Sequence, residues 1–119
     1  MHIRGKDYNC TIDLMMDIIG GKWKMRLLWT LMMDGSQRFG ELKRRCVKIS
    51  AKVLAQQLKE LEQDELITRK SYDEVPPRVE YSISEYGKTV IPFIKQMHEW
   101  SFRHMIKNGV EVTDNDIKS

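Results

Sequence analysis

The order of elements predicted across residues 39–87 constrains this chain more than any other feature. A short basic helix at 40–46, a break and a second amphipathic helix are followed by two short strands around an acidic tip with two prolines. A helix pair that leads directly into a β-hairpin is the plan of a winged helix-turn-helix. We therefore expect a mainly α-helical fold with one small β-hairpin.

The second helix of the pair is predicted over 51–63, with Ser50 as its N-cap. The Ser50 hydroxyl is suited to accept a hydrogen bond from an unpaired amide of the first turn. Apolar residues at i, i+4 and i+7 form one stripe of this helix; they are Leu54, Leu58 and Leu61. At about 100° per residue, the opposite face carries Gln63 and three candidate contacts, Lys52, Gln56 and Lys59.

This opposite face has the chemistry of a DNA reader. Lysine reaches phosphate or guanine, and glutamine pairs with adenine through two hydrogen bonds in the major groove. The N-terminal end of such a helix, here Ser50 and Ala51, normally enters the groove. The surroundings are basic, because residues 36–59 hold seven lysines and arginines against Glu41 alone. The pattern favours a DNA-contacting helix over an ordinary solvated helix face.

The hairpin is predicted from strands at 66–72 and 78–83, joined by a tip at 73–77. Because Asp73 and Glu74 make the tip acidic, basic residues on its flanks are the better phosphate contacts. The flanking candidates are Arg69, Lys70 and Arg78, and Arg38 before the preceding helix is a further candidate.

The segment before this motif is predicted to hold two helices and a strand. The first helix spans 11–19 and ends at Gly20-Gly21, since glycine tolerates the left-handed conformation at a helix stop. The second begins near Lys22. A brief strand at 37–39 is expected to pair with the hairpin.

Ser84 is expected to cap a last helix over 85–107. The apolar surface of that helix exceeds what one small domain needs at its end, so we expect a homodimer formed through the N- and C-terminal helices. Residues 1–9 are expected to be a flexible arm and 108–119 a loose polar tail. The single DNA-binding domain then spans 10–107.

The two cysteines are too few for a disulfide framework. Cys10 directly precedes the first helix, where the partial positive charge of the helix N-terminus favours the thiolate. From the residues alone, a reactive sensor and an inert N-terminal cysteine both remain open. Cys46 lies where the third helix should face inward, and we expect it to be a small core residue that could pair with Cys10 only if the two lie close.

Several function classes find no support in the sequence. No CxxC or clustered His/Cys spacing predicts a zinc site, and no glycine-rich loop has the spacing of a phosphate cradle. No base stands beside either cysteine as a thiol enzyme requires. We therefore expect no enzyme, no metal and no cofactor. No apolar stretch approaches the roughly 18 residues of a membrane span, so we expect a cytoplasmic protein with no membrane partner.

The motifs resemble those of the HxlR-type winged-helix regulators, whose plan is similar to that of MarR-type dimers. The most specific string is EVPPRVEYS at 74–82, followed by Tyr86-Gly87; IIGGKW at 18–23 and RFGEL at 38–42 also match. The match covers about residues 10–100. It implies a dimeric bacterial transcription regulator, repressor or activator, that binds a pseudo-palindromic operator.

The resemblance also implies a role for Cys10, with which the family's N-terminal cysteine aligns. In several members that cysteine senses oxidants or electrophiles, so such a small molecule is an expected partner. Two departures stand out: Thr11 replaces a frequent proline, and Val47-Lys48 replaces a common Pro-Gly. The alternatives are a winged helix controlled by a reversible small ligand, or one used for protein contacts alone.

Overall fold

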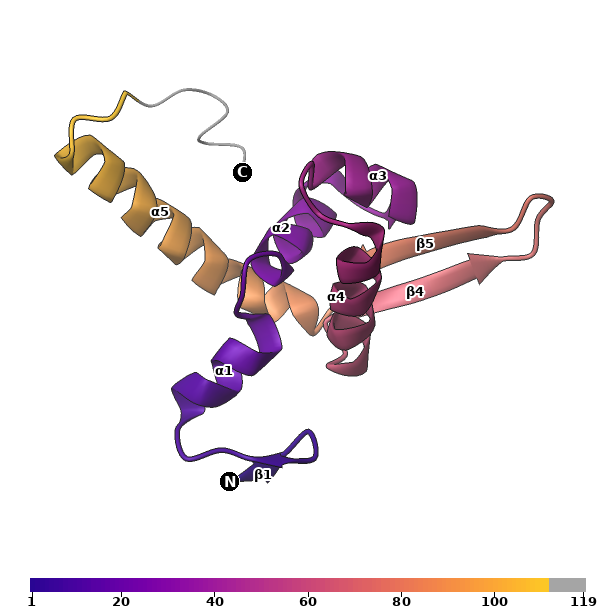
Figure 1. Cartoon of the computed structure of the whole chain (residues 1–119), viewed down its shortest axis with the longest axis horizontal. Helices are drawn as coiled ribbons and strands as arrows, with labels where there is room; N and C mark the ends of the chain where they lie inside the picture. The colour runs from indigo at the N-terminus through magenta and orange to yellow at the C-terminus, as the bar shows by residue number, and fades with distance from the viewer. Residues whose placement is uncertain (112–119) are drawn as a thin grey trace.

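Three helices form the centre of the molecule, whose computed structural model describes residues 1–111 (Figure 1). The elements in chain order are β1 (His2–Ile3), β2 (Lys6–Asp7), α1 (Thr11–Ile19), α2 (Lys24–Asp34), β3 (Gln37–Arg38), α3 (Phe39–Arg45), α4 (Ala51–Gln63), β4 (Ile67–Tyr72), β5 (Arg78–Ile83), the 3-10 helix η1 (Gly87–Val90) and α5 (Ile91–Lys107). Figure 1 shows α2, α3 and α4 together, with the β4–β5 wing projecting to one side and α5 to the other. The predicted winged helix-turn-helix is confirmed.

Leucines from three helices form the core. Those no more than 2% exposed are Leu27, Leu28 and Leu31 of α2, Leu42 of α3, and Leu54, Leu58 and Leu61 of α4. The predicted stripe of α4 is therefore the buried one. Each fully buried leucine contributes about 1.5–3 kcal/mol relative to an exposed one, so this packing fixes the rotation of α4 about its own axis.

The sheet places the wing next to the start of α3. Its strands are antiparallel in the order β3-β5-β4, with Gln37 opposite Tyr81 and Arg38 opposite Glu80. The expected brief strand before α3 thus pairs with the hairpin. This pairing joins the basic α3–α4 region to the wing in one body.

The junction between the wing and the last helix differs from the single helix predicted there. Ser84 Oγ accepts a hydrogen bond from the Gly87 amide at 2.8 Å and donates to the Glu65 carbonyl at 2.7 Å. Ser84 therefore accepts a hydrogen bond from the first residue of η1, whose N-cap is Tyr86, and α5 starts only after η1. Pro92 lies in the first turn of α5, where its missing N–H removes no helical hydrogen bond.

Residues 1–9, expected to be a flexible arm, form a β-ribbon instead. β1 and β2 pair antiparallel with His2 opposite Asp7, and Tyr8 is only 7% exposed. The physical reason is a contact far along the chain, since Arg4 binds Asp64. Of the expected polar tail at 108–119, residues 112–119 lie outside the described part of the chain.

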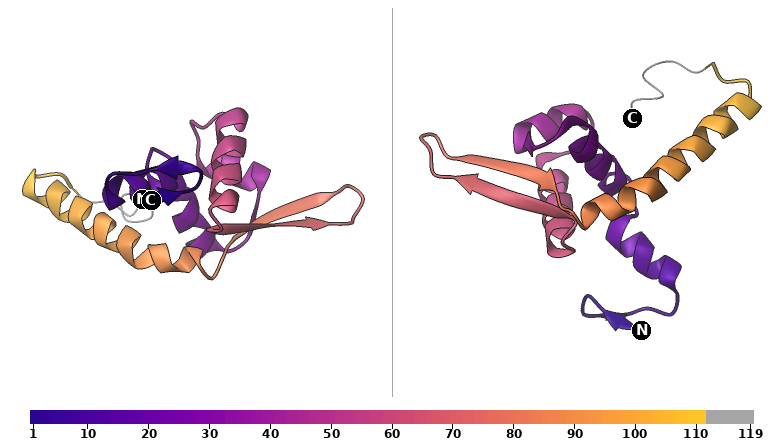
Figure 2. Two further views of the ribbon diagram at one scale, coloured as in Figure 1. Left: turned by 90° about the horizontal axis from the view of Figure 1, so that it is seen from below. Right: turned by 180° about the vertical axis from the view of Figure 1, so that it is seen from behind.

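The molecule is extended rather than spherical. Its radius of gyration is 15.9 Å, against about 13 Å for a compact domain of this length, because α5 and the wing project from the centre (Figure 2). Both α1 and α5 expose large apolar side chains: Ile12 is 62% exposed and Trp100 is 64% exposed. Within residues 1–111, no helix is both long and apolar enough to cross a membrane.

Substitution of Gly87 tests the packing at the junction between the wing and η1. A Cβ atom at Gly87 would lie 2.1 Å from the Leu66 carbonyl oxygen, whereas one at Gly40 would have nothing closer than the end of the Arg44 side chain at 3.7 Å. We expect Gly87→Ala to lower the free energy of unfolding by about 2 kcal/mol. Gly40→Ala should leave it unchanged or raise it by up to about 1 kcal/mol. Urea unfolding at one fixed protein concentration measures both, and equal stability of the two variants would contradict the packing described.

Candidate nucleic-acid interface and thiol site

The exposed face of α4 is set by its cap and its core contacts. The Val53 amide donates to Ser50 Oγ at 3.1 Å, as expected of an N-cap. With the leucine stripe buried, the opposite side of the helix faces solvent. Lys52, Gln56 and Lys59 lie there and are exposed, whereas Ser50 and Ala51 are exposed at the N-terminal end of the helix.

A tight turn after the end of α3 sets the direction in which α4 starts. The Ile49 amide donates to the Cys46 carbonyl at 2.9 Å, and Ile49 is only 3% exposed. Val47-Lys48, the departure from the usual Pro-Gly, forms the exposed part of this turn. On the other side of α3, Arg38 is exposed at the N-cap, and its amide donates to Glu41 Oε1 at 2.9 Å. Arg38 is therefore exposed at the N-terminal end of α3, where β3 pairs with β5.

The wing divides its basic residues between two faces. The register places Lys70 opposite Glu80 and Tyr72 opposite Arg78, whereas Arg69 lies opposite Tyr81. Side chains alternate along a strand, so Lys70, Tyr72, Glu80 and Arg78 share one face, and Arg69 points to the other. The sequence pattern places these basic residues together on the flanks of the hairpin, and only the register separates their faces.

Arg78 is engaged within the wing. Its guanidinium lies 4.0 Å from the centre of the Tyr72 ring and forms ion pairs with Glu74 at 3.3 Å and Glu80 at 3.6 Å. The Tyr72 hydroxyl donates to Glu80 at 3.3 Å. Lys70 and Arg69 are exposed, so they are better placed than Arg78 to meet a phosphate. Knowing the strand register would have revealed this difference.

The two thiols occupy opposite environments. Cys10 is exposed at the N-cap of α1. Cys46 is 2% exposed, which confirms its predicted place in the core. Burial raises the pKa of the Cys46 thiol, against the smaller lowering effect of the Arg26 charge. Within residues 1–111, no cluster of three His, Cys, Asp or Glu side chains is arranged to hold a metal ion.

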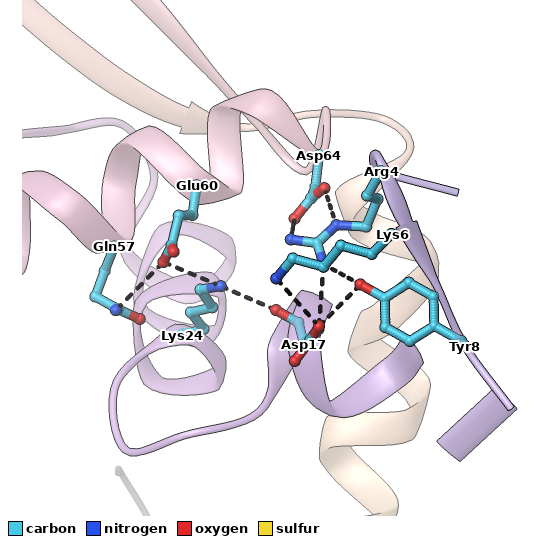
Figure 3. Close-up of polar contacts among 8 residues, drawn as sticks. All are labelled: Arg4, Lys6, Tyr8, Asp17, Lys24, Gln57, Glu60 and Asp64. Carbon is cyan, nitrogen blue, oxygen red and sulfur yellow. Dashed lines mark hydrogen bonds and ion pairs between the residues drawn. The ribbon is translucent and has the colours of Figure 1, made fainter. Parts of the chain in front are cut away.

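A polar network joins one edge of α4 to the N-terminal ribbon and α1 (Figure 3). The sequence pattern did not predict this network. Arg4 binds Asp64 through two nitrogens, at 2.7 and 3.0 Å, and donates to the Tyr8 hydroxyl at 2.8 Å. Tyr8 in turn donates to Asp17 at 2.8 Å. The hydrogen bond with Asp64 is the main cause that raises the pKa of Arg4. The bond from Tyr8, ahead of the charges of Lys6 and Arg4, lowers the pKa of Asp17.

A buried lysine extends this network to the side of α4. Lys24 is 5% exposed; its ammonium donates to the Asp17 carbonyl at 3.1 Å and pairs with Glu60 at 3.3 Å. Gln57, Glu60 and Asp64 follow at i, i+3 and i+7, so they form one edge of α4. The charged residues of the N-terminal ribbon and α1 occur singly and follow no periodic pattern in the sequence. Their contact with this edge of α4 is therefore seen only in the folded chain.

Known proteins share this architecture. The sequence model of the HxlR-like helix-turn-helix family matches residues 18–108. The uncharacterized HTH-type transcriptional regulator YybR of Bacillus subtilis is 46% identical over 91 residues, which cover 76% of this chain and 72% of YybR. The structure of the redox regulator HypR in its oxidized form superposes with a TM-score of 0.74 at 44% identity, covering 79% of this chain and 96% of HypR. Diamide-treated YodB from B. subtilis gives a TM-score of 0.65 at 32% identity, covering 78% and 91%.

The fold, the exposed basic helix and these matches define a DNA-binding transcriptional regulator of the winged helix-turn-helix class, not an enzyme. The chain belongs to the HxlR-like helix-turn-helix family. The family resemblance seen in the sequence is therefore confirmed.

The exposure of Cys10 and the burial of Cys46 predict two distinct rates of thiol reaction. With Ellman's reagent, we expect one thiol per native chain to react quickly and the second to react only after unfolding, because a buried thiol with a raised pKa is a poor nucleophile. Cys10→Ser should remove the fast phase, and Cys46→Ser the slow one. A fast phase that persists in Cys10→Ser would contradict this assignment.

Proposed function

We propose that this protein is a homodimeric, sequence-specific regulator, repressor or activator, whose operator affinity changes when an oxidant or electrophile modifies Cys10 in the cytoplasm. The observation that supports DNA binding is the exposure of Lys52, Gln56 and Lys59 on the face of α4 opposite its buried leucines. An exposed lysine and glutamine face on the second helix of a helix-turn-helix suits the major groove.

In this proposal, α4 enters the major groove with its N-terminal end leading. Ser50 and Ala51 approach the backbone and base edges, while Lys52 in the same turn and Gln56 about one turn further along read bases. Lys59 contacts phosphate. Arg38, Arg69 and Lys70 hold phosphates from α3 and from the two faces of the wing; Arg78 braces the wing, because its guanidinium is already paired and lies on Tyr72.

The dimer is supported by apolar surface that a single chain leaves exposed on α1 and α5. Besides Ile12 and Trp100, Met16 is 52% exposed and Ile106 is 56% exposed. Covering such surface with a second copy removes it from water. A two-fold dimer then presents two α4 helices to a pseudo-palindromic operator, about one DNA turn, or roughly 34 Å, apart.

The thiol half of the proposal is supported by the exposure of Cys10 and by the likeness to HypR, whose name describes a redox regulator. A quinone adds to the Cys10 thiolate through a carbon–sulfur bond. Diamide oxidises the Cys10 thiol together with a second thiol, from Cys10 of the partner subunit or from a low-molecular-weight thiol, to a disulfide while the diamide is reduced to the hydrazine. Either change at the N-cap of α1 alters the end of a helix expected in the dimer. A small shift between protomers would change the spacing of the two readers.

The reading face predicts a specific loss of binding. Lys52→Ala with Gln56→Ala should weaken binding to the protein's operator at least about thirtyfold, since each good base contact is worth about 1–3 kcal/mol. Fluorescence anisotropy with a footprinted operator measures the affinity. Lys95→Ala with Gln96→Ala is the matched control, since it removes the same side chains from the exposed surface of α5. Retained specific binding in the α4 variant would show that another face reads the DNA.

The sensor half is tested with Cys10→Ser. We expect diamide or a quinone to release the wild-type protein from its operator and to leave Cys10→Ser bound, because serine forms neither adduct nor disulfide under these conditions. Cys46→Ser serves as the second variant, since it removes the buried thiol. An equal response of Cys10→Ser and wild type would reject thiol sensing by Cys10.

That result would favour the alternative of a reversible ligand. A cavity of about 530 Å³ lies between the N-terminal ribbon, α1 and η1, with Leu14, Ile18, Leu66 and Val90 among its apolar lining residues. Its size falls within the range of small-molecule sites. Release of Cys10→Ser from DNA by an added metabolite fraction would support this second candidate.

A further inference from the structure

The N-terminal ribbon has too few contacts of its own to stay folded alone. It consists of two residue pairs, His2 with Asp7 and Ile3 with Lys6, and an isolated short hairpin is marginally stable at best in water. Arg4 also adopts a left-handed backbone conformation, with φ of 59°, which is uncommon for a residue with a side chain. Contacts with the rest of the chain must therefore hold the ribbon in place.

Arg4 supplies the strongest of those contacts. Its planar guanidinium binds both carboxylate oxygens of Asp64, a geometry that fixes direction as well as distance. The two side chains are only 21% and 10% exposed, so solvent screens the pair less than an exposed one. Asp64 is the C-cap of α4. Through this contact the ribbon binds the C-terminal end of α4, which is the end farthest from the N-terminus proposed to enter the groove.

The same arginine connects α4 to α1. The third hydrogen bond of Arg4 goes to the Tyr8 hydroxyl, which donates to Asp17 on α1, and Lys6 pairs with the same carboxylate at 3.6 Å. Lys24 provides a parallel link from the Asp17 carbonyl to Glu60 (Figure 3). Two polar links therefore join α1 to one edge of α4.

We propose that the N-terminal ribbon is a strap that sets the position of α4 relative to α1 through the Arg4–Asp64 contact. The strap couples operator affinity to the state of α1 within one protomer. Cys10 lies between Tyr8 and α1, so a change at Cys10 reaches α4 through the strap as well as through the dimer. This inference rests on the proposed function for its effect on DNA, and residues 1–17 lie outside the stretch that the family sequence model matches.

The test uses Arg4→Gln, Asp64→Asn and the double variant in the full chain. Arg4→Gln should raise amide hydrogen exchange in peptides covering 11–19 and 57–66, and should weaken operator binding by the reduced protein roughly three- to tenfold. The double variant should bind no more weakly than either single variant, because both changes break one contact. Diamide should change the affinity of Arg4→Gln less than that of wild type.

Lys88→Gln is the control, since its ion pair with Glu85 lies outside α1, α4 and α5 and has side chains 44% and 92% exposed, and exposed pairs contribute little. It should match wild type in exchange and affinity. Unchanged exchange in 57–66, an unchanged operator affinity, additive losses in the double variant, or an undiminished diamide response would each overturn the strap. If the wild-type protein binds no operator, the proposed function fails separately, and the exchange result still decides whether the ribbon holds α4.

Discussion

The packing of the α4 leucines against α2 is the constraint on which the rest of the structure depends. Leu54, Leu58 and Leu61 are buried against a core that includes Leu27 and Leu28. Because a helix turns by about 100° per residue, burying one stripe fixes the direction of every other side chain on α4. The face proposed to contact DNA is therefore a consequence of core packing.

Between its core and reading faces, α4 has a third, polar edge. This edge, formed by Gln57, Glu60 and Asp64, lies apart from both the buried leucines and the face proposed to contact DNA. Its carboxylates pair with Lys24 and Arg4, which come from elements earlier in the chain. Such partly buried, hydrogen-bonded charges add little net stability but fix geometry. One helix of thirteen residues thus combines a packing surface, a positioning surface and a contact surface, each with its own chemistry.

The wing shows how local electrostatics decides which charges are available. Arg78 and Arg69 look equivalent in the sequence. In the structure, Arg78 lies across Tyr72 between two glutamates, while Arg69 points from the other face of the wing. A guanidinium that already holds two carboxylates would have to give up those contacts to bind phosphate. Glu74 of the acidic tip therefore helps to hold Arg78 within the wing.

The sequence by itself determined the winged-helix plan, the buried stripe of α4, the Ser50 cap and the buried Cys46, because each follows from local periodicity or capping chemistry that neighbouring residues specify. Strand register, the start of α5 after η1 and the folded N-terminal ribbon were decided by the tertiary structure. The ribbon is the clearest case: the Arg4–Asp64 contact joins residues 60 positions apart, and no local pattern encodes which distant charge a side chain will meet once the chain has closed around its core.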